Sequence, residues 1–110
     1  MSNFVELQIE AGATFSTEIV VKESNGSSKN LSNYLARSQL RKSYYSTTAV
    51  DFSVEITDSS NGIINMSLTA ANTSNIKSGR YVYDVEIEDD SETVIRVQEG
   101  IITVLPNVTK

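Results

Sequence analysis

Apolar and polar residues alternate with a period of two along much of this chain, and that alternation is the strongest restriction on its fold. Val50, Phe52, Val54 and Ile56 occupy every second position, with polar residues between them. A strand with one buried face shows this period, whereas a helix repeats every 3.6 residues. The pattern predicts a strand over residues 50–57.

A tight turn and a returning strand follow this segment. Asn61-Gly62 lies in the polar run 59–62, and an Asn-Gly pair supplies the positive φ angles of a short hairpin turn. Ile64, Met66 and Leu68 then resume the alternation. The two segments together predict a β-hairpin.

A second hairpin is predicted near the C-terminus, from a strand over 81–87, a polar turn over 89–92 and a strand over 93–104. The apolar parity changes within the last strand, from odd positions at Ile95 to even positions at Ile102. One extra residue at Glu99-Gly100 would reconcile the two, so we expect a β-bulge there. Pro106 should end the strand, because proline cannot donate to a ladder.

The remaining elements are short as well. Strands are expected over 5–9, 15–22 and 34–41, with a second Asn-Gly turn in 24–28 and one helical turn over 70–77, capped by Ser78-Gly79. Seven or eight strands with frequent turns predict an all-β fold, an antiparallel β-sandwich that forms one domain over residues 1–110. A small barrel is the alternative that the pattern leaves open.

The amino-acid composition argues against catalysis. The 110 residues include neither cysteine nor histidine. The commonest general base and the thiolate nucleophile are therefore absent, and a Ser-His-Asp or Cys-His arrangement cannot be built within the chain. We expect a protein that is not an enzyme and that has no cofactor.

The charge and hydropathy narrow the choice of partners. A formal net charge of −5 argues against nucleic acid, whose phosphates require a basic face. No apolar stretch approaches the roughly 20 residues of a membrane helix. The N-terminus lacks a basic segment followed by an apolar run, so we expect no signal peptide and synthesis in a cytoplasm.

The acidic segment 86–92 raises the question of a metal site. Its carboxylates are the ligands that Ca²⁺ prefers, but they lie across a hairpin tip without the spacing of a calcium-binding loop. Solvated surface carboxylates are the favoured interpretation, and no metal site is predicted.

Opposite charges concentrate on two different segments, a basic strand with aromatic residues after it and the acidic hairpin. If the two strands are neighbours in one sheet, the charges form cross-strand pairs, which is the favoured alternative. If they lie on opposite edges, the basic strand of one copy could dock on the acidic hairpin of another. The candidate interaction surface consists of Arg37, Arg41, Lys42, Tyr44, Tyr45, Glu88, Asp89 and Asp90.

Four segments resemble a pattern in small structural proteins of tailed bacteriophages, including N-terminal modules of baseplate and tail-appendage proteins. They are Leu31–Tyr44, Ser78–Ile87, Arg96–Gly100 and Val104–Thr109. The resemblance extends from about Phe15 to the C-terminus. It implies an immunoglobulin-like β-sandwich and carries over no functional residue.

This resemblance implies a structural or assembly protein of the phage particle, in the head decoration, neck, tail or baseplate. Its partners would be other virion proteins or further copies of itself, with neither nucleic acid nor a membrane as partner. We expect a freestanding subunit that is assembled in the host cytoplasm and located in the virion. A particle-displayed module that binds a host-surface glycan or receptor is the alternative, with Tyr44 and Tyr45 as its candidate platform.

Overall fold

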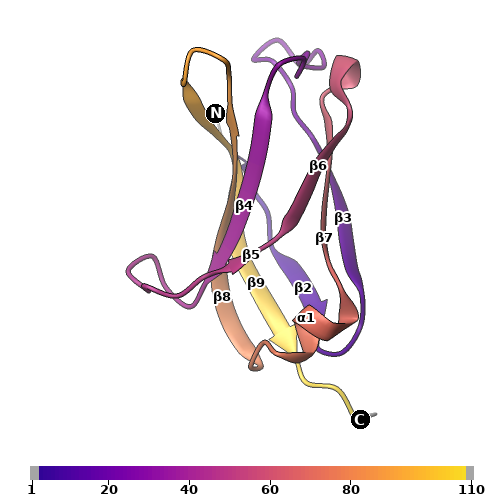
Figure 1. Cartoon of the computed structure of the whole chain (residues 1–110), viewed down its shortest axis with the longest axis vertical. Coiled ribbons are helices and arrows are strands. Elements are labelled where there is room, and N and C mark those ends of the chain that lie inside the picture. Colours follow the sequence, from indigo (N-terminus) through magenta and orange to yellow (C-terminus); the bar gives the residue numbers. More distant parts are fainter. Residues whose placement is uncertain (1–2, 109–110) are drawn as a thin grey trace.

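A computed structural model describes residues 3–108, which form two β-sheets packed face to face (Figure 1). Sheet A has six strands, β1 (Asn3–Phe4), β2 (Leu7–Glu10), β4 (Leu35–Arg41), β5 (Val50–Asp51), β8 (Gly79–Glu88) and β9 (Val94–Leu105). Sheet B has three, β3 (Phe15–Val20), β6 (Ser53–Asp58) and β7 (Ile63–Leu68). The two separate sheets confirm the predicted all-β sandwich and rule out the barrel.

The strand order explains how the predicted strands combine. Sheet A runs β1-β9-β8-β4-β5, with β2 also paired to β9, and sheet B runs β3-β7-β6. β1 and β2 follow one another along β9, and β5 and β6 are one run interrupted at a single residue. Counted this way, the described residues form seven strands, within the predicted number.

Alternating side chains from both sheets fill the space between them. Those that are almost completely buried include Ile9, Leu40, Ile64, Met66, Val85, Ile87, Ile102 and Val104. They occupy the apolar positions of the period-two pattern, so the pattern correctly predicts which face of each strand is inside. Burial of this apolar surface is the main stabilising contribution.

The first strand pairs differently from the expected antiparallel arrangement. Asn3 and Phe4 lie beside Gln98 and Glu99, and Leu7–Glu10 beside Ile102–Leu105, in parallel register. The chain therefore begins along the same strand with which it ends. Period-two alternation cannot predict this, because it gives the buried face of a strand but not the direction of its neighbour.

The predicted strand over 50–57 is divided between the two sheets. Val50 and Asp51 pair with β4 in sheet A, whereas residues from Ser53 onward pair with β7 in sheet B. Phe52 lies at the crossing, donates its N–H to the Ser38 carbonyl at 3.1 Å, and buries its ring against Phe15. An anchored aromatic side chain thus lets one run of residues serve both sheets.

Both predicted hairpins are present, but the first turn is not the Asn-Gly turn that the sequence predicted. Residues Ser59–Asn61 form a 3₁₀ turn, η1, and Gly62 alone takes a positive φ of 69°. A Cβ on Gly62 would lie 2.5 Å from the Val21 carbonyl oxygen, so this position also requires the absence of a side chain. The β8–β9 hairpin closes as predicted, and β9 ends at Leu105, directly before Pro106.

The bulge in β9 lies earlier than predicted. Val85 pairs with Gln98 and Glu86 with Arg96, which leaves Val97 as the extra residue. Val97 and Gln98 are consecutive and both buried, which accounts for the change of parity. The bulge predicted at Glu99-Gly100 is therefore wrong by about two residues.

A short helix joins sheet B to sheet A. The predicted helical turn is present as α1 (Ala70–Ser74), with Thr69 as its N-cap and Asn75, not Ser78-Gly79, as its C-cap. The buried Thr73 hydroxyl donates to the Ala13 carbonyl at 2.8 Å and accepts from Gly12 N–H at 3.1 Å. α1 thereby closes the lower end of the sandwich against the β2–β3 turn (Figure 1).

Within residues 3–108, no helix has the length and apolar character required to span a membrane.

Candidate interaction surface

The eight predicted surface residues all lie on or beside sheet A, in two groups toward the opposite ends of β4. Arg37 and Arg41 are on β4, and Lys42, Tyr44 and Tyr45 are in the loop that projects between β4 and β5 (Figure 1). Glu88 is the last residue of β8, and Asp89 and Asp90 follow it in the turn. The structure brings Arg37 and Glu88 together. It holds the tyrosine loop and the acidic turn apart.

Arg37 forms the centre of a cross-strand ion-pair cluster. Its guanidinium donates to the Glu88 carboxylate at 2.7 Å and to the Glu86 carboxylate at 3.1 Å. These two hydrogen bonds raise the pKa of Arg37, with Glu88 the larger cause. β4 and β8 are direct neighbours, with Arg37 opposite Glu86, so the favoured alternative of intramolecular pairing is the one that the structure shows.

Two further groups of polar contacts lie beside the Arg37 cluster on the same face. Arg96 contacts the Asp84 carboxylate at 3.4 Å and the Glu99 carboxylate at 3.5 Å. The bulge at Val97 turns Glu99 to the same outer face as Arg96, so a bulge predicted about two residues later hides the contact between Arg96 and Glu99.

On the β5 side of Arg37, Gln39 contacts β5 and also Arg41, the next residue of β4 on the same face. Its amide nitrogen donates to Asp51 at 2.7 Å, and its amide oxygen accepts from Arg41 at 2.9 Å. Arg41 also donates to the Ser46 carbonyl, which holds the projecting loop against the sheet. The outer face of sheet A is thus covered by groups of paired polar side chains, centred on Arg37, Arg96 and Gln39.

A hollow of about 300 Å³ lies in this face. Its lining includes Gln39, Arg41, Tyr44, Asp84, Glu86 and Arg96. Burial raises the pKa of the Asp84 carboxyl above its usual value, and the negative charge of Glu86 raises it further. The hollow therefore offers a partly desolvated carboxylate, two guanidinium groups and an aromatic rim, which suits polar or cationic groups of a partner.

The projecting loop carries the exposed aromatic residues. Tyr44 is 66% exposed and Tyr45 is 95% exposed. Lys42, in contrast, places its ammonium 4.8 Å from the ring centroid of Tyr81, and so is engaged within the chain. Of the three, the two tyrosines are the ones presented to a partner.

The acidic turn is organised by its own backbone. One oxygen of Asp89 accepts from the N–H groups of Ser91 and Thr93, both at 2.9 Å. Among residues 3–108, no three acidic side chains gather in a way that could hold a metal ion. Asp89 stabilises the turn, and Asp90 remains exposed beside it.

A larger groove of about 610 Å³ lies where the two sheets separate, between β1 and the end of β3. Its apolar lining includes Val20, Ile87, Ile95 and Val97, with Lys22 and Lys29 also at its walls. Sequence reasoning missed it, because it forms where strands of different sheets separate and no local pattern marks such a gap.

Comparison with known proteins gives a fold and no family. Neither a protein-family model nor a curated protein matches the sequence. Two similar solved structures, the Listeria monocytogenes internalin-like protein lmo2027 (17% identity, 96% of this chain, 29% of that chain) and a family 123 glycoside hydrolase from Clostridium perfringens (18%, 98%, 24%), have TM-scores of 0.47 and 0.46. At such scores neither bears on the role of this chain.

A third similar structure matches over most of both chains. The N-terminal domain of phage TP901-1 ORF48 superposes with a TM-score of 0.57 at 16% identity, over 92% of this chain and 85% of that domain. The chain therefore has a fold that is also found in a bacteriophage protein.

Proposed function

We propose that this chain is a structural or assembly protein of a tailed bacteriophage particle, and that it acts through protein–protein contacts without catalysis. The observation that carries the proposal is the fold shared with the N-terminal domain of phage TP901-1 ORF48 over 92% of this chain. The segments that resemble small phage structural proteins are an independent support. Head decoration, neck, tail and baseplate are the candidate locations.

The strand pairing supports the more specific immunoglobulin-like assignment. β4, β8 and β9 are neighbours in one sheet and β3, β7 and β6 in the other, as in the two sheets of that sandwich, with the first strand moved beside the last. Such sandwiches present flat faces and edges on which other proteins pack. The polar face of sheet A is a surface of this kind.

The composition of purified particles tests the proposal. Particles of the phage or prophage that carries the gene would be banded by density and analysed by quantitative mass spectrometry. We expect the chain at a constant number of copies per particle, and we expect a deletion of the gene to give incomplete, non-infectious particles that a plasmid copy restores. Infectious particles that lack the chain would overturn the proposal.

The exposed tyrosines favour one alternative, a displayed module that binds a host-surface glycan or receptor. Tyr44 lies at the rim of the hollow that also holds Gln39 and Asp84, and an aromatic ring beside planar polar groups suits a sugar. A glycan array probed with the purified chain tests it. Binding that Tyr44→Ala removes would support this alternative, and an array without signal would reject it.

A further inference from the structure

We propose that the outer face of sheet A takes a second copy of this chain, packed face to face about a two-fold axis. The inference rests on the proposed function, because it assumes that the chain acts by attaching to proteins. It adds the surface that is used and one partner, a second copy of the chain. A face that packs on its own copy must be self-complementary, because each residue of the patch meets the same patch.

Exposed apolar residues lie on this face. Leu35 and Val94 flank Glu88 in one row across β4, β8 and β9, and they are 69% and 46% exposed. Phe4, 62% exposed, lies beside Glu99 in the parallel register of β1 and β9. Removing these side chains from water would stabilise a complex, and nothing within the described chain covers them.

The charged residues of the face are of both signs. The arginines Arg37 and Arg96 are about half exposed, whereas their carboxylate partners are 24–36% exposed, namely Glu86, Glu88, Glu99 and Asp84. The guanidinium groups therefore stand out furthest, above more recessed carboxylates. In a two-fold pair, arginines of one copy can reach carboxylates of the other, and arginine is among the residues enriched at interfaces.

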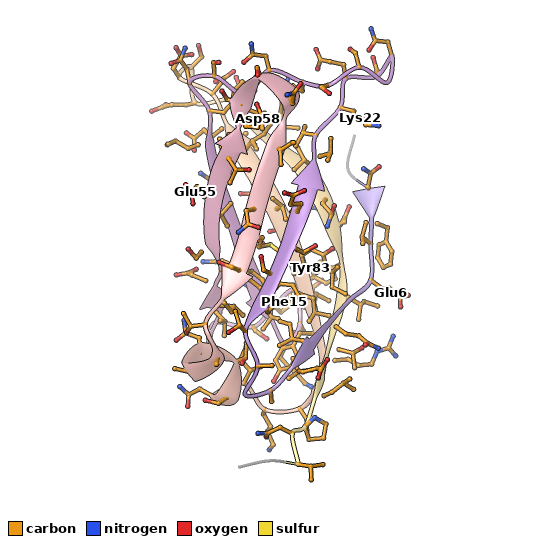
Figure 2. The ribbon with its side chains drawn as sticks, turned by 90° about the vertical axis from the view of Figure 1, so that its right-hand side faces the viewer. Glu6, Phe15, Lys22, Glu55, Asp58 and Tyr83 are labelled. Atoms are coloured by element: carbon orange, nitrogen blue, oxygen red, sulfur yellow. The ribbon has the colours of Figure 1, made fainter. Side chains whose placement is uncertain are left out.

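The outer face of sheet B is different. Its outward residues are Ser16, Glu18, Ser53, Glu55, Thr57, Ile63, Asn65 and Ser67, with Val20 at one edge. Figure 2 looks onto this sheet, with Glu55 on β6. Its charges are acidic only, so two copies packed through it would oppose carboxylates, which argues against self-association here.

The size of the sheet A face suits a dimer of low affinity. Five strand positions at about 4.8 Å and seven residues of β4 at about 3.3 Å give a footprint of roughly 24 by 23 Å, or about 550 Å², before side-chain relief. Stable complexes bury about 600–1,000 Å² on each partner. The footprint lies just below this range, which suits a weak, reversible dimer.

Sedimentation equilibrium of the purified chain, from about 1 µM to about 1 mM, tests the proposal. We expect a reversible monomer–dimer equilibrium that Leu35→Lys weakens at least about tenfold, because the new charge would lose its water in the interface. Leu35 is exposed and faces Glu88, so a lysine should be compatible with the folded monomer. Val20→Lys on sheet B is the matched control and should leave the equilibrium unchanged.

A second measurement does not depend on a charged substitution. Because the chain has no cysteine, Leu35→Cys and Val20→Cys each introduce a single thiol for maleimide labelling. We expect labelling of the first to slow as protein concentration rises, and labelling of the second to stay constant. A monomer throughout the range, or a dimer that Val20→Lys disrupts and Leu35→Lys does not, would overturn the proposal while leaving the particle-composition test of the proposed function intact.

Discussion

Gly100 illustrates how one residue can determine where a neighbouring strand lies. A Cβ at this position would fall 2.1 Å from the Val5 carbonyl oxygen. Val5 cannot withdraw easily, because its N–H donates to Glu99 at 2.9 Å and its carbonyl accepts from the Tyr83 hydroxyl at 2.8 Å. The glycine is thus required by the close approach of another backbone.

We therefore expect Gly100→Ala to lower the free energy of unfolding by about 3 kcal/mol, through overpacking and the loss of hydrogen bonds to Val5. Urea denaturation would measure the change. Gly26→Ala is the control, since nothing lies within 4 Å of the position that a Cβ would take there, and the positive φ should cost only about 1 kcal/mol. Equal losses would contradict the account.

Two aspartates should respond to pH in opposite directions. Burial and nearby Glu86 raise the pKa of Asp84, so the folded chain binds this proton more tightly than the unfolded chain, and stability is lost as pH rises through this pKa. Hydrogen bonds from Asn61 and Ser60 lower the pKa of Asp58, so its contribution is lost as pH falls.

Each variant is compared with the unsubstituted chain as pH rises from about 3 to about 7. The relative stability of Asp84→Asn should increase over this range, and that of Asp58→Asn should decrease. Urea midpoints at several pH values would show the two trends. Both effects should be small, because Asp84 is partly exposed and Asp58 lies at the surface. Parallel curves for the two variants would refute the assigned causes.

At the scale of the elements, Arg37 belongs to the pairing of β4 with β8. Arg37→Ala should weaken the fold slightly, because the ion pairs are exposed. Arg37→Glu should weaken it more, since it places a third carboxylate beside Glu86 and Glu88. Denaturation of the two variants would measure the difference.

The charge-swapped pair Arg37→Glu with Glu86→Arg is the control, and it should recover part of the loss. If the double variant is no more stable than Arg37→Glu, the cross-strand contact does not contribute. The effect on the fold also means that reversing Arg37 is a poor test of docking between copies.

The sequence predicted strands and their buried faces well, since alternation is a local property. It did not predict which sheet a strand joins, because the break at Phe52 and the parallel first strand depend on contacts far along the chain. The pairing of Arg37 with Glu86 and Glu88 was one of two predicted alternatives. The contact of Arg96 with Glu99 was missed, because the bulge that brings Glu99 to the outer face lies at Val97.

At the scale of the whole molecule, Thr73 joins two of the connections between the sheets, α1 and the β2–β3 turn, at the lower end of the sandwich. Thr73→Val keeps the shape but removes the hydroxyl that bonds to the Gly12 N–H and the Ala13 carbonyl, so we expect a loss of about 1 kcal/mol in urea denaturation. Ser74→Ala, which removes an exposed hydroxyl on the same helix, should cost less than about 0.5 kcal/mol. Similar losses would show that the junction at Thr73 is unimportant.

The parallel pairing of the first and last strands has a mechanical consequence. The chain enters near one pole of the 43 Å long axis and leaves at the other, with β2 and β9 side by side between them (Figure 1). Tension applied at the two termini would pull these strands in opposite directions along their length, so their hydrogen bonds would bear the load together and not break one after another. A subunit held at both poles would resist stretching for that reason.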